Sequence, residues 1–213
     1  MAVTQAQVDS LKRFIGQGEI YLNCEKPADM TALVLTAGVP KDVGGAQDAA
    51  SVGLTNGPAS LEYKPEFKGL EVEQAFGELA PRLTKETVTL KFKCAEATYD
   101  RIKAALPMST LVSVVGTGAT PTSNVLLVGG KIDATTQCIV LVSKIGTYVN
   151  GGTTVQLYEW VCLYEAMSVD GVKLDWKRGE NRMVEVTITG YADVTRSEGD
   201  QLFQIGQLAD PGV

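Results

Sequence analysis

The sequence predicts a mainly β protein with one or two short helices. Hydrophobic and polar residues alternate with a period of two over several long stretches. Turn signals such as "NGG" and "DG" separate these stretches, and only two segments have helical spacing. With 213 residues, 45% of them hydrophobic, the chain is long enough to bury a core of its own.

The first quarter of the chain predicts a helix, a strand and a long loop. Val8, Leu11 and Ile15 recur at helical spacing, and "EIYLN" follows as a strand. The stretch 24–52 is rich in Ala, Gly, Asp and Pro. Loops of this length inside a compact domain are usually functional or disordered.

The clearest strand signals lie between residues 61 and 94. Alternation runs from Leu61 to Phe67 and slips by one residue at Gly69, which predicts a bulge or a tight turn there. The run "ETVTLKFKC", 86–94, alternates most regularly and predicts a strand with one apolar and one polar face.

A helix is expected over "AEATYDRIKAAL", 95–106, and Pro107 ends it. Residues 110–128 then predict short strands broken by "GTGATPTSN". The last third predicts a meander in which two strands of roughly 14 residues, about 45 Å long at ~3.3 Å per residue, form a projecting hairpin. The pattern fades after Val194, so we expect a single domain over 1–195 and a C-terminal arm over 196–213.

Most enzyme classes are disfavoured. The chain has no histidine, which removes Ser-His-Asp and Cys-His catalysis and the commonest metal ligand. Glu71 and Glu73 would share one strand face, where a solvated surface is a far more common role than acid–base catalysis. The Gly-rich stretches "VGGKID" and "GTGATP" lack the residues of phosphate-binding loops. We expect no catalytic residues, no cofactor and no metal.

Charge and cysteine usage set further limits. A formal net charge of −6 disfavours a basic nucleic-acid reader. Neither a basic, apolar leader nor a long apolar run is present, so we expect a soluble chain without membrane insertion. The four cysteines form no CxxC pair and are expected to be reduced and buried, although a cross-link between neighbouring subunits is a further possibility.

Three aromatic residues are expected on one face of a strand. Tyr158, Trp160 and Tyr164 alternate with other residues and share that face with Cys162. Such a row usually belongs to a core or a subunit interface. The sharper alternative is a platform that binds carbohydrate, in a monomeric β-sandwich.

The stretch 52–106, "VGLTNGPASLEYKPEFKGLEVEQAFGELAPRLTKETVTLKFKCAEATYDRIKAAL", resembles the tail tube (major tail) proteins of long-tailed bacteriophages. The similar elements are "VGLTNG", a hairpin carrying "LEVEQ", the strand "KETVTLKF" and a helix ending "IKAAL". They cover about a quarter of the chain, and the meander gives weaker support.

The resemblance implies a β-sandwich or barrel of the tail-tube type, flanked by a helix, with a long loop and an extended C-terminal arm. Subunits would self-assemble into hexameric rings, stacked into a hollow tube through which double-stranded DNA is ejected without sequence-specific binding. Further partners would be tape measure, tail terminator and baseplate or tip proteins, with a sheath if the tail contracts. The location would be the virion tail, assembled in the host bacterial cytoplasm.

The resemblance also implies roles for individual residues. The candidate lumen-facing residues are Glu71, Glu73, Thr87 and Thr89. The candidate residues for packing between helix and sheet are Val88, Leu90, Phe92, Tyr99, Ile102 and Leu106. The candidate contacts between rings or subunits, drawn from the loop 24–52, the strand 154–168 and the arm, are Asp29, Leu33, Leu35, Val43, Trp160, Leu202 and Phe203.

An acidic, hydroxyl-rich lumen wall would let DNA slide, because it repels phosphates. Lys91 and Lys93 depart from that picture, because their positive charges would attract phosphates.

Two alternative functions are kept. A tube of the type VI secretion kind, which is similar in fold, is the nearest one. The monomeric carbohydrate-binding module belongs to another functional class.

Overall fold

The computed structural model describes residues 18–45, 48–55, 57–70, 79–94, 102–103, 106, 109–114, 123–130, 135–150, 152–170 and 184–210. The fold is mainly β and antiparallel, as predicted. Its strands are β1 (Gly18–Leu22), β2 (Leu35–Thr36), β3 (Val39–Pro40), β4 (Ala50–Leu54), β5 (Ser60–Leu70), β6 (Leu79–Cys94), β7 (Ser109–Val114), β8 (Ser123–Val128), β9 (Gln137–Asn150), β10 (Thr153–Ser168), β11 (Val184–Tyr191) and β12 (Phe203–Asp210).

One large sheet organises the molecule, in the strand order β4-β1-β9-β10-β11-β6-β5. A backbone bridge between Thr55 and Cys94 joins the chain just after β4 to the end of β6. Six strands, from β4 round to β6, therefore close around a common interior, and β5 lies outside this ring as an extra edge strand.

The first hydrophobic core lies inside the ring, and all six strands contribute to it. Alternation explains why: Val88, Leu90 and Phe92 of β6 are buried, while the intervening residues face out. Val186 and Ile188 of β11 lie opposite Phe92 and Leu90 in register. The alternation predicted for 86–94 is confirmed by this burial pattern.

A second core lies on the outer face of β1, β9 and β10. Cys138 and Val140 of β9 and Trp160 and Tyr164 of β10 pack there beneath the segment 24–49. Both faces of β9 and β10 are therefore covered near their middle. The predicted long loop is not featureless, because it contains the β2–β3 hairpin and returns to the sheet as β4.

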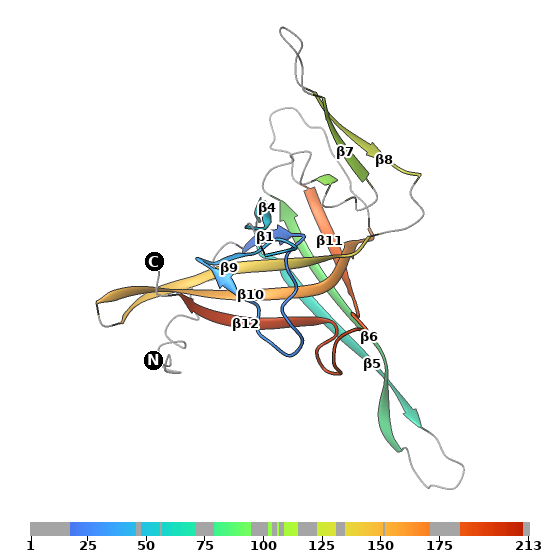
Figure 1. Ribbon diagram of the computed structural model, residues 1–213. Coiled ribbons are helices and arrows are strands. Elements are labelled where there is room, and N and C mark those ends of the chain that lie inside the picture. The colour runs from blue at the N-terminus through green and yellow to red at the C-terminus, as the bar shows by residue number, and fades with distance from the viewer. Residues whose placement is uncertain are drawn as a thin grey trace.

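Three hairpins project from the body in different directions (Figure 1). The β9–β10 hairpin has strands of 14 and 16 residues and turns at "NGG", which confirms the predicted long hairpin. The β5–β6 hairpin extends past the end of β11, and β7–β8 pairs as a separate two-stranded sheet. The register of β5 shifts between Lys68 and Leu70, which confirms the irregularity predicted at Gly69.

Two predicted features differ from the structure or lie beyond what it describes. The predicted N-terminal helix falls outside the described residues. Of the predicted helix 95–106, the structure describes Ile102 and Lys103, which are helical, and Leu106. The expected C-terminal arm is corrected: residues 203–210 form β12, which pairs with β10 from Gln156 to Leu163. In the described part of the chain, no helix is long and apolar enough to cross a membrane.

Candidate functional site

One polar surface is the outward face of β5, β6 and β11. The strand registers place the even-numbered residues of β5 from Ser60 to Glu66 beside odd-numbered residues of β6 and β11 on this face. The register of β5 and β6 shifts between Glu66 and Phe67, so Lys68 lies opposite Arg82. Thr87 lies opposite Lys64, and Thr89 lies between Glu62 and Thr189. We call this surface the β5–β6–β11 face; its residues are Ser60, Glu62, Lys64, Glu66, Lys68, Arg82, Lys85, Thr87, Thr89, Lys91, Lys93, Glu185, Thr187 and Thr189.

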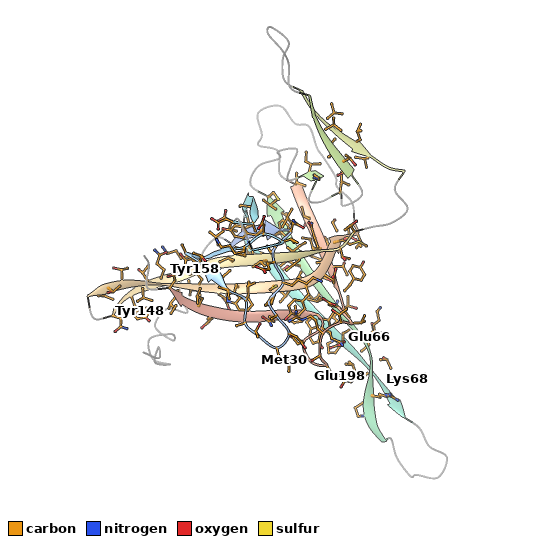
Figure 2. The ribbon with its side chains drawn as sticks, viewed as in Figure 1. Met30, Glu66, Lys68, Tyr148, Tyr158 and Glu198 are labelled. Carbon is orange, nitrogen blue, oxygen red and sulfur yellow. The ribbon has the colours of Figure 1, made fainter. Side chains whose placement is uncertain are left out.

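Opposite charges alternate across the β5–β6–β11 face. Lys64 Nζ lies 2.7 Å from Glu62 Oε1, Lys85 Nζ lies 3.8 Å from Glu66 Oε1, and Lys93 Nζ lies 3.9 Å from Glu185 Oε2. A shallow groove of about 310 Å³ lies on this face, and its lining includes Asp170 and the four threonines Thr87, Thr89, Thr187 and Thr189. In Figure 2, Glu66 and Lys68 lie on the projecting part of β5.

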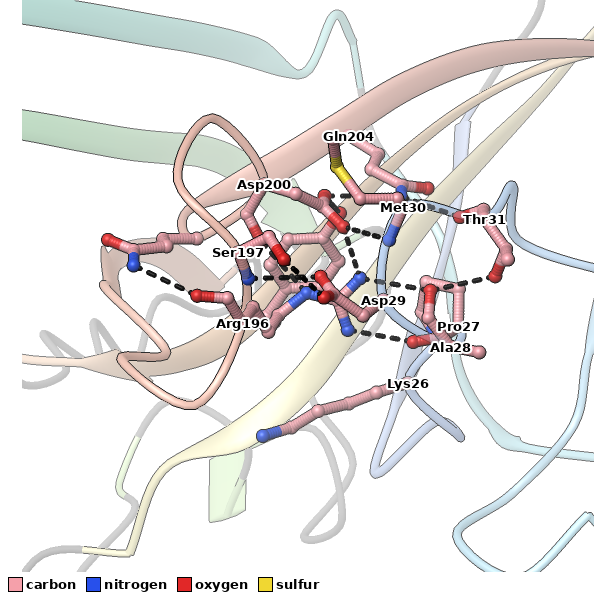
Figure 3. Close-up of polar contacts among 12 residues, drawn as sticks. Lys26, Pro27, Ala28, Asp29, Met30, Thr31, Arg196, Ser197, Asp200 and Gln204 are labelled. Atoms are coloured by element: carbon pink, nitrogen blue, oxygen red, sulfur yellow. Dashed lines mark hydrogen bonds and ion pairs between the residues drawn. The ribbon is translucent and has the colours of Figure 1, made fainter.

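A second polar cluster fixes the start of the long loop against the segment before β12 (Figure 3). Arg196 is buried and donates to the carbonyls of Pro27 (2.7 Å) and Ala28 (3.2 Å). Its guanidinium also pairs with Asp200 at 2.6 Å and lies 4.0 Å from the centre of the Tyr164 ring. One side chain thus connects the loop, β10 and the approach to β12; we call this cluster the Arg196 lock.

Asp200 completes the lock from the other side. It accepts hydrogen bonds from the Met30 amide at 2.8 Å and from the Tyr164 hydroxyl. Asp29 accepts from the amide and the hydroxyl of Ser197, at 3.1 and 2.6 Å. The loop from Pro27 to Thr31 is therefore held within a single subunit.

Lys26 forms a smaller ion cluster next to the lock. Its ammonium group pairs with Asp193 at 2.9 Å and with Glu165, and Thr136 also donates to Glu165. Hydrogen bonds from Thr195 lower the pKa of Asp193, with a further contribution from Lys26. Burial works against the charge of Lys26, but its two carboxylate partners raise its pKa overall.

Asp200 makes the lock sensitive to acid. Burial alone would raise its pKa, but the donors Tyr164, Met30 and Arg196 hold the pKa of Asp200 well below its usual range. A carboxyl with a lowered folded pKa takes up its proton first in the unfolded chain. Its stabilisation is thus complete above the unfolded value, near pH ~4, and is lost as the pH falls toward the folded value.

We therefore expect the free energy of unfolding to fall as the pH drops below about 4. In Asp200→Asn this fall should be shallower, because the variant lacks the titrating carboxyl, although it is less stable at neutral pH. Urea unfolding of both proteins between about pH 2.5 and 7 measures the difference. Parallel curves for the two proteins would contradict the role given to Asp200.

The structure places the candidate lumen-facing and helix–sheet packing residues in different parts of the fold. Thr87 and Thr89 lie together on the β5–β6–β11 face, whereas Glu71 and Glu73 are outside the described residues. Ile102 packs against the core that contains Val88, Leu90 and Phe92. Leu106 is half-buried and hydrogen-bonds with Lys103 and Ser109 through its backbone, and Tyr99 is outside the described residues.

The candidate contact residues divide into buried and accessible ones. Leu33 and Leu35 (each 7% exposed) and Trp160 (4%) belong to the second core, so they stabilise the subunit itself and offer almost no surface to a neighbour. Val43 is 61% exposed. Asp29 is exposed but engaged with Ser197; Leu202 and Phe203 pack against the first core, where Phe203 meets the ring of Tyr63.

Burial also determines which roles the aromatic row and the four cysteines can have. Trp160, Cys162 and Tyr164 are core residues, and only Tyr158 is half-exposed, so the row forms no carbohydrate platform. All four cysteines are buried, as predicted, which leaves their thiols inaccessible to a neighbouring subunit. Cys138 and Cys162 lie 3.5 Å apart, Sγ to Sγ. Burial and the nearby Cys138 raise the pKa of Cys24, so its thiol stays protonated.

Sequence reasoning missed the Arg196 lock. Arg196 and Asp200 lie in a stretch of turn residues that resembles a solvated arm, and their partners in the long loop are about 170 positions away in the chain. The one local signal is the arginine and aspartate at i, i+4 in a segment without a strand pattern.

The sequence matches no protein-family model and no curated protein.

Proposed function

We propose that this chain is a structural subunit that self-assembles into hexameric rings, stacked as the hollow tail tube of a bacteriophage. The motifs between residues 52 and 106 suggest the family. The observation that carries self-assembly is that the closed body of the subunit bears three projecting hairpins with exposed apolar side chains (Figure 1).

Exposed apolar residues gather on the hairpins. Phe67 and Leu83 face each other across the β5–β6 hairpin, on the side that continues the first core outward. Val125 and Leu127 are exposed on β8, and Val149 lies at the end of β9. A two-stranded ribbon is marginal by itself in water, so contacts with further copies would stabilise each hairpin.

The edges of the sheet favour controlled association over open aggregation. β5 is the outermost strand beside β6, and Pro65 sits within it, as do Lys64 and Lys68. Proline and lysine on an edge strand limit unregulated strand pairing. Association through the apolar side of the hairpin is compatible with such an edge.

The Arg196 lock supports the same function in another way. The long loop proposed to contact the next ring is already fixed at Pro27–Thr31 within the subunit. A preorganised loop has less conformational entropy to lose when rings stack. Its exposed Met30, Val34 and Val43 provide apolar surface for that contact.

Electron microscopy of the concentrated protein, with light scattering after size exclusion, tests the proposal. We expect rings or tubes of uniform diameter with a stain-filled lumen. Phe67→Glu should remain monomeric, because it places a charge in the proposed contact. Val194→Glu, a matched change at an exposed site on the body, should assemble like the unaltered protein. A protein that stays monomeric at every concentration would refute the proposal.

A further inference from the structure

Three side chains with complementary chemistry meet in the ion cluster next to the Arg196 lock. Lys26 Nζ contacts Asp193 Oδ2 at 2.9 Å and also contacts Glu165 Oε1. An amine and a carboxyl group are the two components of an amide bond, and a second carboxylate beside them can carry protons between them. The cluster therefore contains the groups needed to join two distant parts of the chain covalently.

The fold holds the two carboxylates in place. Glu165 of β10 is the strand partner of Tyr191 of β11, which stands two residues before Asp193. The hydroxyl of Thr136 donates to Glu165 Oε2, while Glu165 Oε1 meets Lys26. Strand pairing and one hydroxyl thus orient the carboxylate that would move protons.

The backbone on both sides of Lys26 is also fixed. The amide of Glu25 donates to the carbonyl of Lys41 at 2.8 Å. The carbonyl of Pro27 accepts from Arg196 at 2.7 Å, as part of the Arg196 lock (Figure 3). Two reactive groups held together in a suitable geometry can reach an effective concentration of about 10⁵–10⁸ M.

The two oxygens of Asp193 have different environments. Oδ2 faces the ammonium group of Lys26, whereas Oδ1 accepts hydrogen bonds from the hydroxyl of Thr195 at 2.6 Å and from its amide at 3.2 Å. Attack of a nitrogen on Cγ moves negative charge onto one carboxyl oxygen, and donors aimed at that oxygen stabilise the charge. Oδ1 is thus placed as the oxyanion and Oδ2 as the leaving oxygen.

We propose that Lys26 and Asp193 become joined by an isopeptide bond between Nζ and Cγ, with Glu165 as the proton carrier. The ion pair is the state before the reaction. Glu165 takes one proton from the ammonium group and passes it to Oδ2, and the neutral amine attacks Cγ. A second proton follows the same route, the Cγ–Oδ2 bond breaks, and Oδ2 leaves as water. The third proton stays on the amide nitrogen, so atoms and charge balance without an oxidant.

The bond would connect two positions that are 167 residues apart, within one subunit. It would fasten the start of the long loop to the segment after β11, beside the Arg196 lock. Because it needs no second copy, it goes beyond the proposed function and does not depend on it. Lys26 and Asp193 are both charged in the cluster, so the neutral forms that react are minor species. We therefore expect the bond to form slowly after folding.

Mass spectrometry of the full-length protein, sampled over days after purification, tests the proposal. We expect a growing fraction of chains that are lighter by one water molecule. Digestion with trypsin should then yield a branched peptide that joins the segments containing Lys26 and Asp193. The Lys41–Asp48 pair at 2.7 Å, in which Asp48 is well exposed, is the internal control and should remain unlinked.

Substitutions assign the role of each group. Glu165→Gln keeps both partners of the bond but lacks the proton carrier, so it should keep its full mass, as should Lys26→Gln. Thr195→Val removes one donor to Asp193 Oδ1 and should slow bond formation by up to about 10²-fold. Thr195→Ser keeps the hydroxyl and should react like the unaltered protein. Circular dichroism and thermal unfolding establish that each variant is folded.

The mass of the unaltered protein decides the outcome even if a variant fails to fold. Full mass throughout, with no branched peptide, would overturn the proposal. A loss of water that persists in Lys26→Gln would also overturn it, because the water would then come from another site, such as a cyclic imide at Asp170–Gly171. Equal rates in the unaltered protein and Glu165→Gln would refute the role of Glu165.

Discussion

Replacing Arg196 by alanine should cost about 3–5 kcal/mol of stability, because it leaves the buried Asp200 carboxylate without its cation. It also removes the donors to the carbonyls of Pro27 and Ala28. For a chain of this size the melting temperature should fall by roughly 6–20 °C. Urea unfolding measures the free energy, and hydrogen exchange at the Met30 amide, which bonds to Asp200, reports on the loop.

Two further variants distinguish the effect of the buried Arg196–Asp200 ion pair on stability from the effect of losing any positive charge. Arg196→Lys keeps the charge but loses the planar fork that reaches Asp200 and both carbonyls, so it should recover only part of the stability. Lys41→Ala breaks the Lys41–Asp48 pair at 2.7 Å, in which Asp48 is well exposed, and should cost less than about 1 kcal/mol. Equal effects of Arg196→Ala and Lys41→Ala would show that the lock does not hold the loop.

The strands that the sequence predicts well are those with one buried and one solvated face. Residues 87–94 of β6 and the whole of β11 alternate because one side of each faces the closed interior. The long β9–β10 hairpin is equally predictable, since its turn carries Asn150 and two glycines. Local pattern is enough wherever local geometry decides which side chain is buried.

The features that the sequence does not predict depend on distant contacts. β12 has no clean alternation, because most of its side chains are only half-buried, and the residues of β10 that pair with it lie 40 to 54 positions earlier. Leu33 and Leu35 look like loop residues, yet they cover the outer side of β9 and β10. Trp160 lies in a strand that is buried on both faces, so its row of aromatics cannot be told from a surface platform by periodicity alone.

Replacing Trp160 by alanine should destabilise the subunit by about 3–5 kcal/mol, because the indole fills the second core between β9, β10 and the long loop. The close approach of β12 adds to the loss: a Cβ at Gly206 would lie 2.3 Å from the indole ring, so the glycine backbone packs directly on it. The cavity should also weaken the pairing of β12 with β10, where Gly206 is the partner of Trp160. Urea unfolding measures the first effect, and hydrogen exchange along β12 measures the second.

Phe67→Ala is the matched control, since it removes an aromatic ring that is 61% exposed. It should change the stability of the isolated subunit by no more than about 0.5 kcal/mol. The two variants should therefore have opposite profiles: Trp160→Ala lowers stability, whereas Phe67→Ala leaves stability intact and weakens assembly. If Trp160→Ala unfolded like the unaltered protein, Trp160 would not be a core residue and a role at the surface would have to be reconsidered. If both variants lost stability equally, the β5–β6 hairpin would be part of the subunit core, and its apolar side would not be available to another copy.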